Sequence, residues 1–574
     1  MRKKLLLLCV FFCFFFLCAN GRNVVRLRGQ NKVLAEQDSW NDEEEEVLYE
    51  TSYMGGWELV KANAGISAMH LVLFPNTTKA VMFDATNLGP SQLRLPKGVE
   101  CRRYNNGTRE DCWAHASEFD TETGEIRALK VETNTWCSSG GLNSEGVLVQ
   151  SGGYSEGSRA VRYLWPCENC NWVEYPNALS GPRWYATQQI LADGSFIVVG
   201  GRNMLNYEFI PSQGRRNPTN YYLQFLKETR DNIPGSENNL YPHVHLSTDG
   251  NVFILANCRA ILLDPVHNTV VRQYPDLPDG ARNYPASSSS AVLPIRLSNN
   301  TIHLEVLVCG GSSKWAFHAQ EINKEYLPAL QSCGRIRITD HNPNWEMEEM
   351  PSRRVMGDML ILPTGDLLLI NGAKNGSAGW EHGENPNFNP VLYKPELNGT
   401  RFEELNPTTI PRMYHSTSAV LPDGKILVAG SSSHVRYEFH GVKYPTEVSV
   451  EKFSPPYLDP DLAAQRPIIA TQNSSFVLRY GEVFHLEICL NHAIGRFKRF
   501  KVRMYSPPFT THGYSMNQRM IVLAETSAWI QSNGNYWITL TAPPNGAVAP
   551  PGYYMLFVVY HGLPSKAIWV KLGS

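Results

Sequence analysis

The chain has 574 residues, of which 43% are apolar and only 18% are charged, so it is long enough to bury a large core. The formal net charge is −2, and no stretch forms the basic stripe that a nucleic-acid partner requires. The 44 glycines and 37 prolines favour many turns, as in an all-β protein.

Residues 1–21 have the pattern of a secretory signal peptide. Arg2, Lys3 and Lys4 precede an apolar run over 5–18, and small residues suitable for cleavage follow at 19–21. The run is shorter than the roughly 20 residues that a membrane helix needs, with a signal anchor as the alternative. We expect a secreted, extracellular protein with no membrane span.

Residues 22–50 form a polar arm, and its acidic run at 42–46 is typical of a solvated segment. Six Asn-x-Ser/Thr sequons agree with export and predict a glycoprotein. They begin at Asn76, Asn106, Asn299, Asn375, Asn398 and Asn473.

Three of the twelve cysteines lie in the signal peptide, which leaves nine for the mature chain. In an oxidising compartment most of these should form disulfides. Spacing favours the local pairs Cys101–Cys112 and Cys167–Cys170, with Cys309–Cys333 as a further candidate, whereas Cys258 and Cys489 have no close partner. Since nine is odd, at least one cysteine must have another role.

From about residue 50 the chain repeats one unit: an apolar strand, a tight polar turn, a second apolar strand and a small residue. Seven such units occupy residues 66–86, 138–157, 186–202, 243–259, 289–313, 355–376 and 416–433. A period of about 50 residues is the kelch signature, with one four-stranded blade for each repeat. We therefore predict a seven-bladed β-propeller over residues 51–463. The alternative is a β-sandwich built of unrelated hairpins.

Residues 464–574 lack this period and contain short apolar segments such as "EVFHLEICL" and "YYMLFVVYHG". Several short strands at this spacing predict a C-terminal β-sandwich of the immunoglobulin type.

Four stretches carry residues with chemical potential. Cys137 in "TNTWCSSGG", Tyr185 in "GPRWY" and the pair Tyr414–His415 in "IPRMYH" each precede a repeated hairpin. His512 lies in the second domain, in a proline-rich loop between two expected strands. Residues at the mouth of a propeller axis meet in space although they are distant in sequence, so these stretches are the candidates for a site.

Each residue also has an ordinary interpretation. A tyrosine beside a strand is most often a packing residue, a histidine in a loop is usually exposed, and Cys137 is a possible disulfide partner of Cys258 or Cys489. Neighbours in a regular strand point to opposite faces, so Tyr414 and His415 serve one site only if the chain bends there. The preceding Pro411 favours such a bend.

Taken in this order and at these repeats, the stretches resemble the copper-radical oxidases. The Trp-Cys-Ser-Ser-Gly-Gly, Pro-Arg-Trp-Tyr and Pro-Arg-Met-Tyr-His sequences resemble glyoxal oxidase more closely than galactose oxidase, from about residue 55 to the C-terminus. The resemblance implies that an aldehyde such as glyoxal or methylglyoxal reacts, as its hydrate, with O2 and water. The products are a carboxylic acid and H2O2.

The resemblance also implies a role for each residue. Cys137 is similar to the cysteine that forms a thioether with a tyrosine ring, and Tyr185 to that ring, which holds the radical and binds copper. Tyr414 resembles the axial ligand, and His415 and His512 the two imidazole ligands of one copper ion. The other eight cysteines then suffice for four disulfides.

This set of residues suits the implied chemistry. Imidazole nitrogens and phenolic oxygens around an open tetragonal position favour Cu(II). A phenol with a pKa of about 10 loses its proton when it binds the cation. The thioether makes the ring easier to oxidise, and copper with the radical holds two oxidising equivalents. Neither flavin nor nicotinamide is needed, which agrees with the lack of a Gly-x-Gly-x-x-Gly fingerprint.

One departure concerns the shielding of the radical. In galactose oxidase a tryptophan from the loop after the tyrosine's blade covers the thioether ring, but the matching stretch here, "GGRNMLNYEFIP", has none. Another residue must cover the ring in this chain.

Two other functions remain open. One is a galactose or primary-alcohol oxidase with the same copper site, and the other is a non-catalytic kelch propeller that binds cell-wall glycan or protein. We expect a monomer that acts on a small aldehyde and O2, with cell-wall material as a candidate partner.

Overall fold

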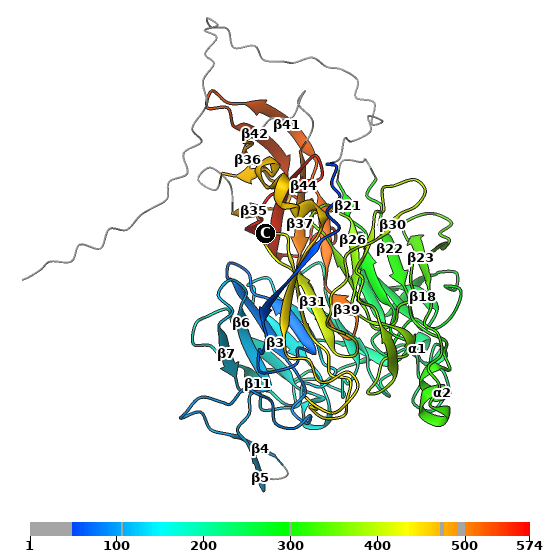
Figure 1. Ribbon diagram of the computed structural model, residues 1–574. Helices are drawn as coiled ribbons and strands as arrows, with labels where there is room; N and C mark the ends of the chain where they lie inside the picture. The colour runs from blue at the N-terminus through cyan, green and yellow to red at the C-terminus, as the bar shows by residue number, and fades with distance from the viewer. Residues whose placement is uncertain (1–48, 105–106, 298–300, 471–475, 492–499, 574) are drawn as a thin grey trace, which may run out of the picture.

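A computed structural model describes residues 49–104, 107–297, 301–470, 476–491 and 500–573 (Figure 1). The expected signal peptide, nearly all of the acidic arm and the sequons at Asn106, Asn299 and Asn473 lie outside these residues. The described chain is built of strands, with the two short α-helices α1 (Gln224–Glu228) and α2 (Ala316–Asn323), which confirms the all-β class. No helix in the described part is long and apolar enough to cross a membrane.

Antiparallel sheets that take four strands from the first 454 residues recur along this part of the chain, and a hairpin of the second domain extends the first of them to six strands. In chain order, the first three contain β2 (His70–Leu73), β3 (Lys79–Phe83), β6 (Ala116–Asp120) and β7 (Ile126–Leu129); β8 (Ser139–Leu142), β9 (Leu148–Ser151), β10 (Val161–Leu164) and β11 (Val173–Tyr175); and β12 (Ala186–Ile190), β13 (Phe196–Gly200), β14 (Asn206–Phe209) and β15 (Tyr221–Tyr222).

The next two sheets contain β16 (His243–Leu246), β17 (Val252–Ala256), β18 (Arg259–Asp264) and β19 (Thr269–Gln273); and β20 (Ser289–Val292), β22 (Glu305–Cys309), β23 (Ser332–Arg337) and β24 (Glu346–Glu349). Then follow β25 (Asp358–Ile361), β26 (Leu367–Ile370), β29 (Val391–Tyr393) and β30 (Phe402–Glu404); and β31 (Ser416–Val420), β32 (Ile426–Gly430), β33 (Val450–Ser454) and β1 (Gly56–Lys61). Small hairpins, β4 (Arg102–Tyr104) with β5 (Arg109–Asp111) and β27 (Ala373–Gly376) with β28 (Gly383–Pro386), project from this framework.

Each repeated unit of the sequence contains the antiparallel pair that was predicted from it. The strands of these pairs are almost fully buried, because both faces of a sheet pack against neighbouring sheets. The last sheet takes its outer strand, β1, from the start of the domain, so the two ends of the repeat meet in one sheet.

A buried arginine explains why the Pro-Arg-x-Tyr phrase recurs. Arg183, Arg282 and Arg412 each donate a hydrogen bond from Nη1 to the carbonyl that ends or follows the second strand of their sheet, at 2.8, 2.6 and 2.9 Å. A buried cation that satisfies a backbone carbonyl in this way fixes the segment before each first strand.

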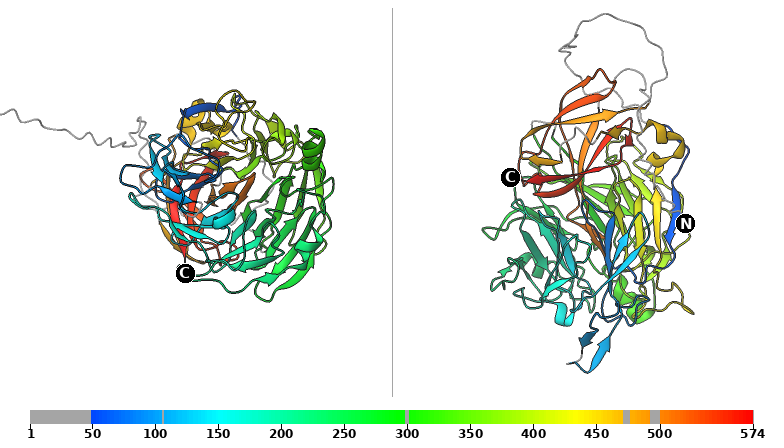
Figure 2. Two further views of the ribbon diagram at one scale, coloured as in Figure 1. Left: turned by 90° about the horizontal axis from the view of Figure 1, so that it is seen from below. Right: turned by 90° about the vertical axis from the view of Figure 1, so that its left-hand side faces the viewer.

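The first strands of the sheets lie side by side around a common interior. Contacts join β8 to β12, β12 to β16, β20 to β25, β25 to β31 and β31 to β2. Figure 2 (left) shows the sheets disposed around this interior.

The C-terminal part forms two facing sheets above the first domain (Figure 1). One contains β40 (Arg519–Val522), β37 (Lys501–Ser506), β43 (Gly552–Tyr560), β45 (Ile568–Gly573), β35 (Val477–Arg479) and β44 (Leu563–Pro564), and the other β34 (Ile468–Ile469), β36 (Val483–Cys489), β42 (Tyr536–Thr541) and β41 (Glu525–Ile530). A strand of the first domain, β21 (Ile295–Arg296), pairs with β40, and one apolar core runs across both domains.

The second domain sends a hairpin into the interior of the first. Strands β38 (Phe509–Thr511) and β39 (Tyr514–Met516) contact the first strands β2, β8, β12, β20, β25 and β31, and β38 pairs with β2. The sequence predicted only a loop here. The segment "FTTHGYSM" instead alternates across a Gly513 turn with φ +75°, which is the pattern of a hairpin.

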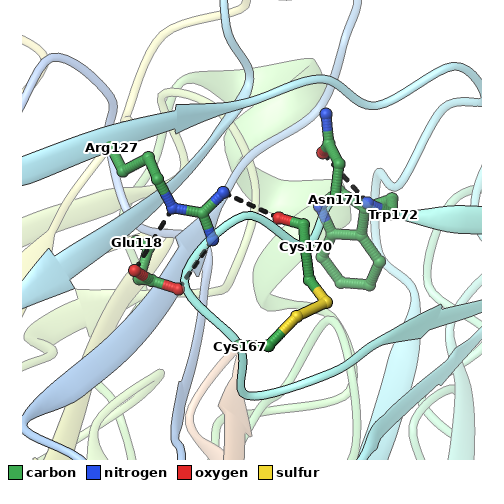
Figure 3. The surroundings of a disulfide bond; sticks show 6 residues. All are labelled: Glu118, Arg127, Cys167, Cys170, Asn171 and Trp172. Atoms are coloured by element: carbon green, nitrogen blue, oxygen red, sulfur yellow. Dashed lines mark hydrogen bonds and ion pairs between the residues drawn. A yellow bond between two sulfur atoms is a disulfide. The ribbon is translucent and has the colours of Figure 1, made fainter.

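Three predicted disulfides are present: Cys101–Cys112, Cys167–Cys170 and Cys309–Cys333. Beside the second of these, Arg127 pairs with Glu118 and donates a hydrogen bond to the Cys170 carbonyl oxygen (Figure 3). The described residues contain three disulfides rather than the four for which eight cysteines would suffice, and Cys258 is a free thiol in the turn between β17 and β18.

Tyr514→Phe should weaken the anchoring of the hairpin. The buried Tyr514 hydroxyl donates to the Val244 carbonyl and accepts from the Val244 N–H, both at 2.8 Å. Losing the hydroxyl leaves a buried donor and acceptor without partners, so the free energy of unfolding should fall by about 1–3 kcal/mol. Chemical denaturation measures this free energy, and the control is Tyr553→Phe, at a partly exposed tyrosine of β43. Equal stability of both variants would contradict the anchoring role.

Candidate metal centre

The five predicted site residues converge in the interior of the first domain. Cys137 precedes β8, Tyr185 precedes β12, Tyr414 and His415 precede β31, and His512 occupies the turn between β38 and β39. All five side chains are buried. One cluster therefore draws on three sheets of the first domain and on the second domain.

Four of these residues have a backbone conformation that side chains other than glycine rarely adopt. The φ angles are +54° for Cys137, +64° for Tyr185, +64° for His415 and +50° for His512. A residue other than glycine in the left-handed conformation costs on the order of 1 kcal/mol or more in free energy. Residues in such strained conformations are concentrated at functional sites. At His415 this conformation supplies the bend that was expected after Pro411.

The same conformation recurs where other sheets begin, at Tyr241, Ser287 and Met356. The repeat thus turns the chain just before each first strand. The predicted site residues occupy only some of these equivalent positions. The segment before β12 therefore has Tyr185 alone, whereas the segment before β31 has the pair Tyr414–His415.

The donor atoms lie close together. The Cys137 Sγ is 3.1 Å from the His512 Nε2, and one ligand atom from each of Cys137, His415 and His512 lies within 4.8 Å of the others. The rings of His415 and His512 are 4.7 Å apart, and those of Tyr414 and His415 stack at 3.8 Å.

A third tyrosine that the sequence interpretation missed joins the two predicted ones. The Tyr284 hydroxyl lies 3.1 Å from the Tyr185 hydroxyl and 3.1 Å from the Tyr414 hydroxyl, and its ring stacks on Tyr185 at 4.3 Å. The signal for it is the segment "ARNYP", which repeats the Arg-x-Tyr phrase before β20. Three phenolic oxygens therefore meet beside the two imidazoles.

Two features of the histidines fit a bound metal ion. Neither ring nitrogen of buried His415 has a hydrogen-bond partner among the residues that the structure describes. His512 Nδ1 lies 2.7 Å from Thr511 Oγ1, which orients the ring and leaves Nε2 facing the cluster. A buried imidazole without partners is costly unless a ligand occupies its nitrogens.

Burial controls the protonation of the cluster. It lowers the pKa of His415 and of His512 well below the usual value, so both imidazoles are neutral and able to bind a cation. It raises the pKa of Tyr185 and Tyr414 well above 10, so the phenols ionise only beside a positive charge. Burial also raises the pKa of the Cys137 thiol, and the neighbouring Tyr185 side chain opposes this rise.

The covering of Tyr185 is now visible. The ring of Trp184 lies 4.7 Å from that of Tyr185. Trp184 directly precedes Tyr185 in the sequence, whereas the tryptophan of galactose oxidase comes from a loop that follows the tyrosine's blade. The "GGRN" stretch supplies Arg202, whose guanidinium carbon is 5.9 Å from the Tyr185 ring centre and 5.1 Å from that of Trp184. Tyr284 covers the ring as well.

These observations define a class: a two-domain all-β protein with a buried cluster of imidazole and phenol groups that could hold a metal ion, completed by a hairpin of the second domain. Comparison with known families agrees. The family model described as the glyoxal oxidase N-terminus matches residues 69–457, and that of the galactose oxidase-like early set domain, which is immunoglobulin-like, matches residues 466–572.

Similar proteins span nearly the whole chain. Aldehyde oxidase GLOX1 of Arabidopsis thaliana is 49% identical over 528 residues, which cover 91% of this chain and 85% of that protein. Aldehyde oxidase GLOX of Vitis pseudoreticulata is 43% identical over 525 residues, or 90% and 97% of the two chains. A fungal alcohol oxidase of the AA5 family, solved in complex with copper, shares the fold with a TM-score of 0.67 and 19% identity, over 91% of this chain and all of that chain.

The chain belongs to the glyoxal oxidase family of copper-radical oxidases.

Proposed function

We propose that the protein is a copper-radical oxidase that converts small aldehydes such as glyoxal or methylglyoxal to carboxylic acids. One oxygen molecule and one water are consumed for each aldehyde, and H2O2 is released. The observation that carries this proposal is the convergence of Tyr185, Tyr414, His415 and His512 in one buried cluster.

Each residue of the cluster has a proposed role. Tyr185, Tyr414, His415 and His512 hold one copper ion, and Cys137 forms a thioether with the Tyr185 ring to make the radical cofactor. The Tyr185 N–H donates a hydrogen bond to the Cys137 carbonyl oxygen at 3.0 Å, which supports this pairing because it holds the two residues beside each other before any bond forms. Catalysis then depends on Cys137, Tyr185 and Tyr414.

The chain itself prepares the site. Bound copper together with the oxidised Tyr185 ring supplies two oxidising equivalents. His415 and His512 enter as neutral ligands, since burial opposes their protonation. Tyr284 lies between the hydroxyls of Tyr185 and Tyr414 and holds both phenols in place. Burial of the cluster excludes water from the radical ring.

The architecture around the site is part of the proposal. The recurring sheets, the contacts between their first strands and the closure of the last sheet by β1 support a seven-bladed propeller over residues 51–463. The immunoglobulin-like domain is proposed to occupy residues 464–574.

Disulfides support a secreted protein with the signal peptide removed at residue 21. We also propose that it acts as a monomer, with cell-wall material as a candidate partner.

His512→Ala should remove copper without unfolding the chain. The variant lacks the one ligand that comes from the second domain, so copper affinity should fall by about 100-fold or more. Metal analysis after dialysis and circular dichroism measure the two properties, with exposed His267→Ala as the control. Full copper occupancy in His512→Ala would exclude this histidine as a ligand.

Oxygen consumption on glyoxal, methylglyoxal and galactose tests the reaction. We expect turnover on the two aldehydes, one H2O2 for each O2, and little turnover on galactose. Preference for galactose or another primary alcohol would establish an alcohol oxidase with the same site. No turnover on any substrate by copper-loaded protein would favour a kelch propeller that only binds glycan or protein.

A further inference from the structure

A line of redox-active aromatic side chains leads from the buried centre to the surface. The ring of Tyr185 lies 4.7 Å from that of Trp184, and Trp184 lies 4.7 Å from Tyr154. Tyr185 is only 3% exposed, whereas Tyr154 is 38% exposed. We name these three residues the aromatic chain. It connects the proposed radical to solvent through two ring-to-ring contacts.

The backbone holds the aromatic chain in place. The Gly153 N–H donates to the Arg183 carbonyl at 3.0 Å, and the Tyr154 N–H donates to the Asn134 carbonyl at 3.3 Å. Gly153 has a φ of +132°, and a Cβ added there would lie 2.1 Å from the Asn134 oxygen. Only glycine permits this close approach, so Tyr154 is bound to the segment that carries Trp184.

Two further tryptophans form a branch of the cluster, and one of them, Trp380, is partly buried like Trp184. Trp136 lies 4.9 Å from both Tyr154 and Trp184, and it stacks on Trp380 at 4.7 Å. Trp136 is only 9% exposed. Tyr154 is therefore the member of the cluster that offers a phenol to a reagent in solution.

Charge beside the aromatic chain does not block the removal of an electron. A lone guanidinium over Trp184 would oppose a positive charge on the indole. Arg202 is instead paired with Glu237, with its Nε and Nη2 at 2.9 and 3.0 Å from the two carboxylate oxygens. The carboxylate of Glu237 therefore offsets part of the field of the cation at Trp184.

We propose that Tyr154 and Trp184 form the route by which a one-electron oxidant at the surface converts Tyr185 to its radical. The proposal rests on the function proposed above. The oxidant takes one electron from Tyr154, which releases its phenolic proton. An electron from Trp184 and a proton from solvent then restore Tyr154, and the Tyr185 phenolate restores Trp184. The net result is a reduced oxidant and a neutral Tyr185 radical, with no net transfer of protons.

The test measures radical formation rather than turnover. Copper-loaded protein, first reduced to the radical-free Cu(II) state, is mixed with hexachloroiridate(IV), and radical formation is followed by stopped-flow absorption and by the loss of the Cu(II) signal in electron paramagnetic resonance. Tyr154→Phe keeps the ring but removes the oxidisable hydroxyl. Because the electron must then cross a longer gap in one step, the rate should fall on the order of tenfold or more.

Controls separate a route from a change in structure. Tyr222→Phe removes an exposed tyrosine of β15 outside the aromatic chain, and it should leave the rate of radical formation unchanged. Fully oxidised Tyr154→Phe should turn over aldehyde at the rate of the unaltered protein, because Tyr154 makes no contact with the copper ligands among the described ring pairs. Equal rates of radical formation in Tyr154→Phe and the unaltered protein would overturn the route. If the unaltered protein forms no radical, the proposed function fails, and the route fails with it.

Discussion

The whole site depends on one physical constraint: the hairpin of the second domain must fill the interior of the first. The first strands expose edge backbone groups toward that interior, and buried groups of this kind need partners. Side chains around the hairpin supply them: Asn517 bonds the Gly140 carbonyl and the Ile190 N–H, and Gln518 bonds the Ile361 N–H. The contacts that satisfy these edges also bring His512 to the cluster.

This arrangement explains how the strained backbone persists. The left-handed backbone conformation of the residues before the first strands is unfavourable by itself. Hydrogen bonds from buried arginines and contacts with the inserted hairpin hold the backbone in this conformation from both sides. The same packing keeps His415 and His512 neutral and the phenols of Tyr185 and Tyr414 protonated until a cation arrives. Folding thus prepares the proposed metal site, in which buried donor groups are held close together.

The sequence revealed the parts of the fold that have local signals. Hairpins with a polar turn, the change of pattern near residue 464 and three disulfides follow from periodicity and spacing. The resemblance implied that the His512 loop reaches the first domain, but the hairpin β38–β39 and its partners could not be predicted, because they depend on contacts between residues 92 and 377 positions apart. Tyr284 was missed for a related reason. Its Arg-x-Tyr motif is present in the sequence, but only the structure shows that its hydroxyl lies between those of Tyr185 and Tyr414. The cover of Tyr185 by Trp184 likewise comes from ring geometry.

The central claim is that Cys137 and Tyr185 make one cofactor, and peptide mapping of copper-treated protein tests it most directly. Protein produced without copper should carry a Cys137 thiol that alkylation detects. After copper and air, the thiol should be lost and the two peptides joined by a bond that survives disulfide reductants. A Cys137 thiol that still alkylates after copper is removed would show that no thioether has formed and would contradict the account.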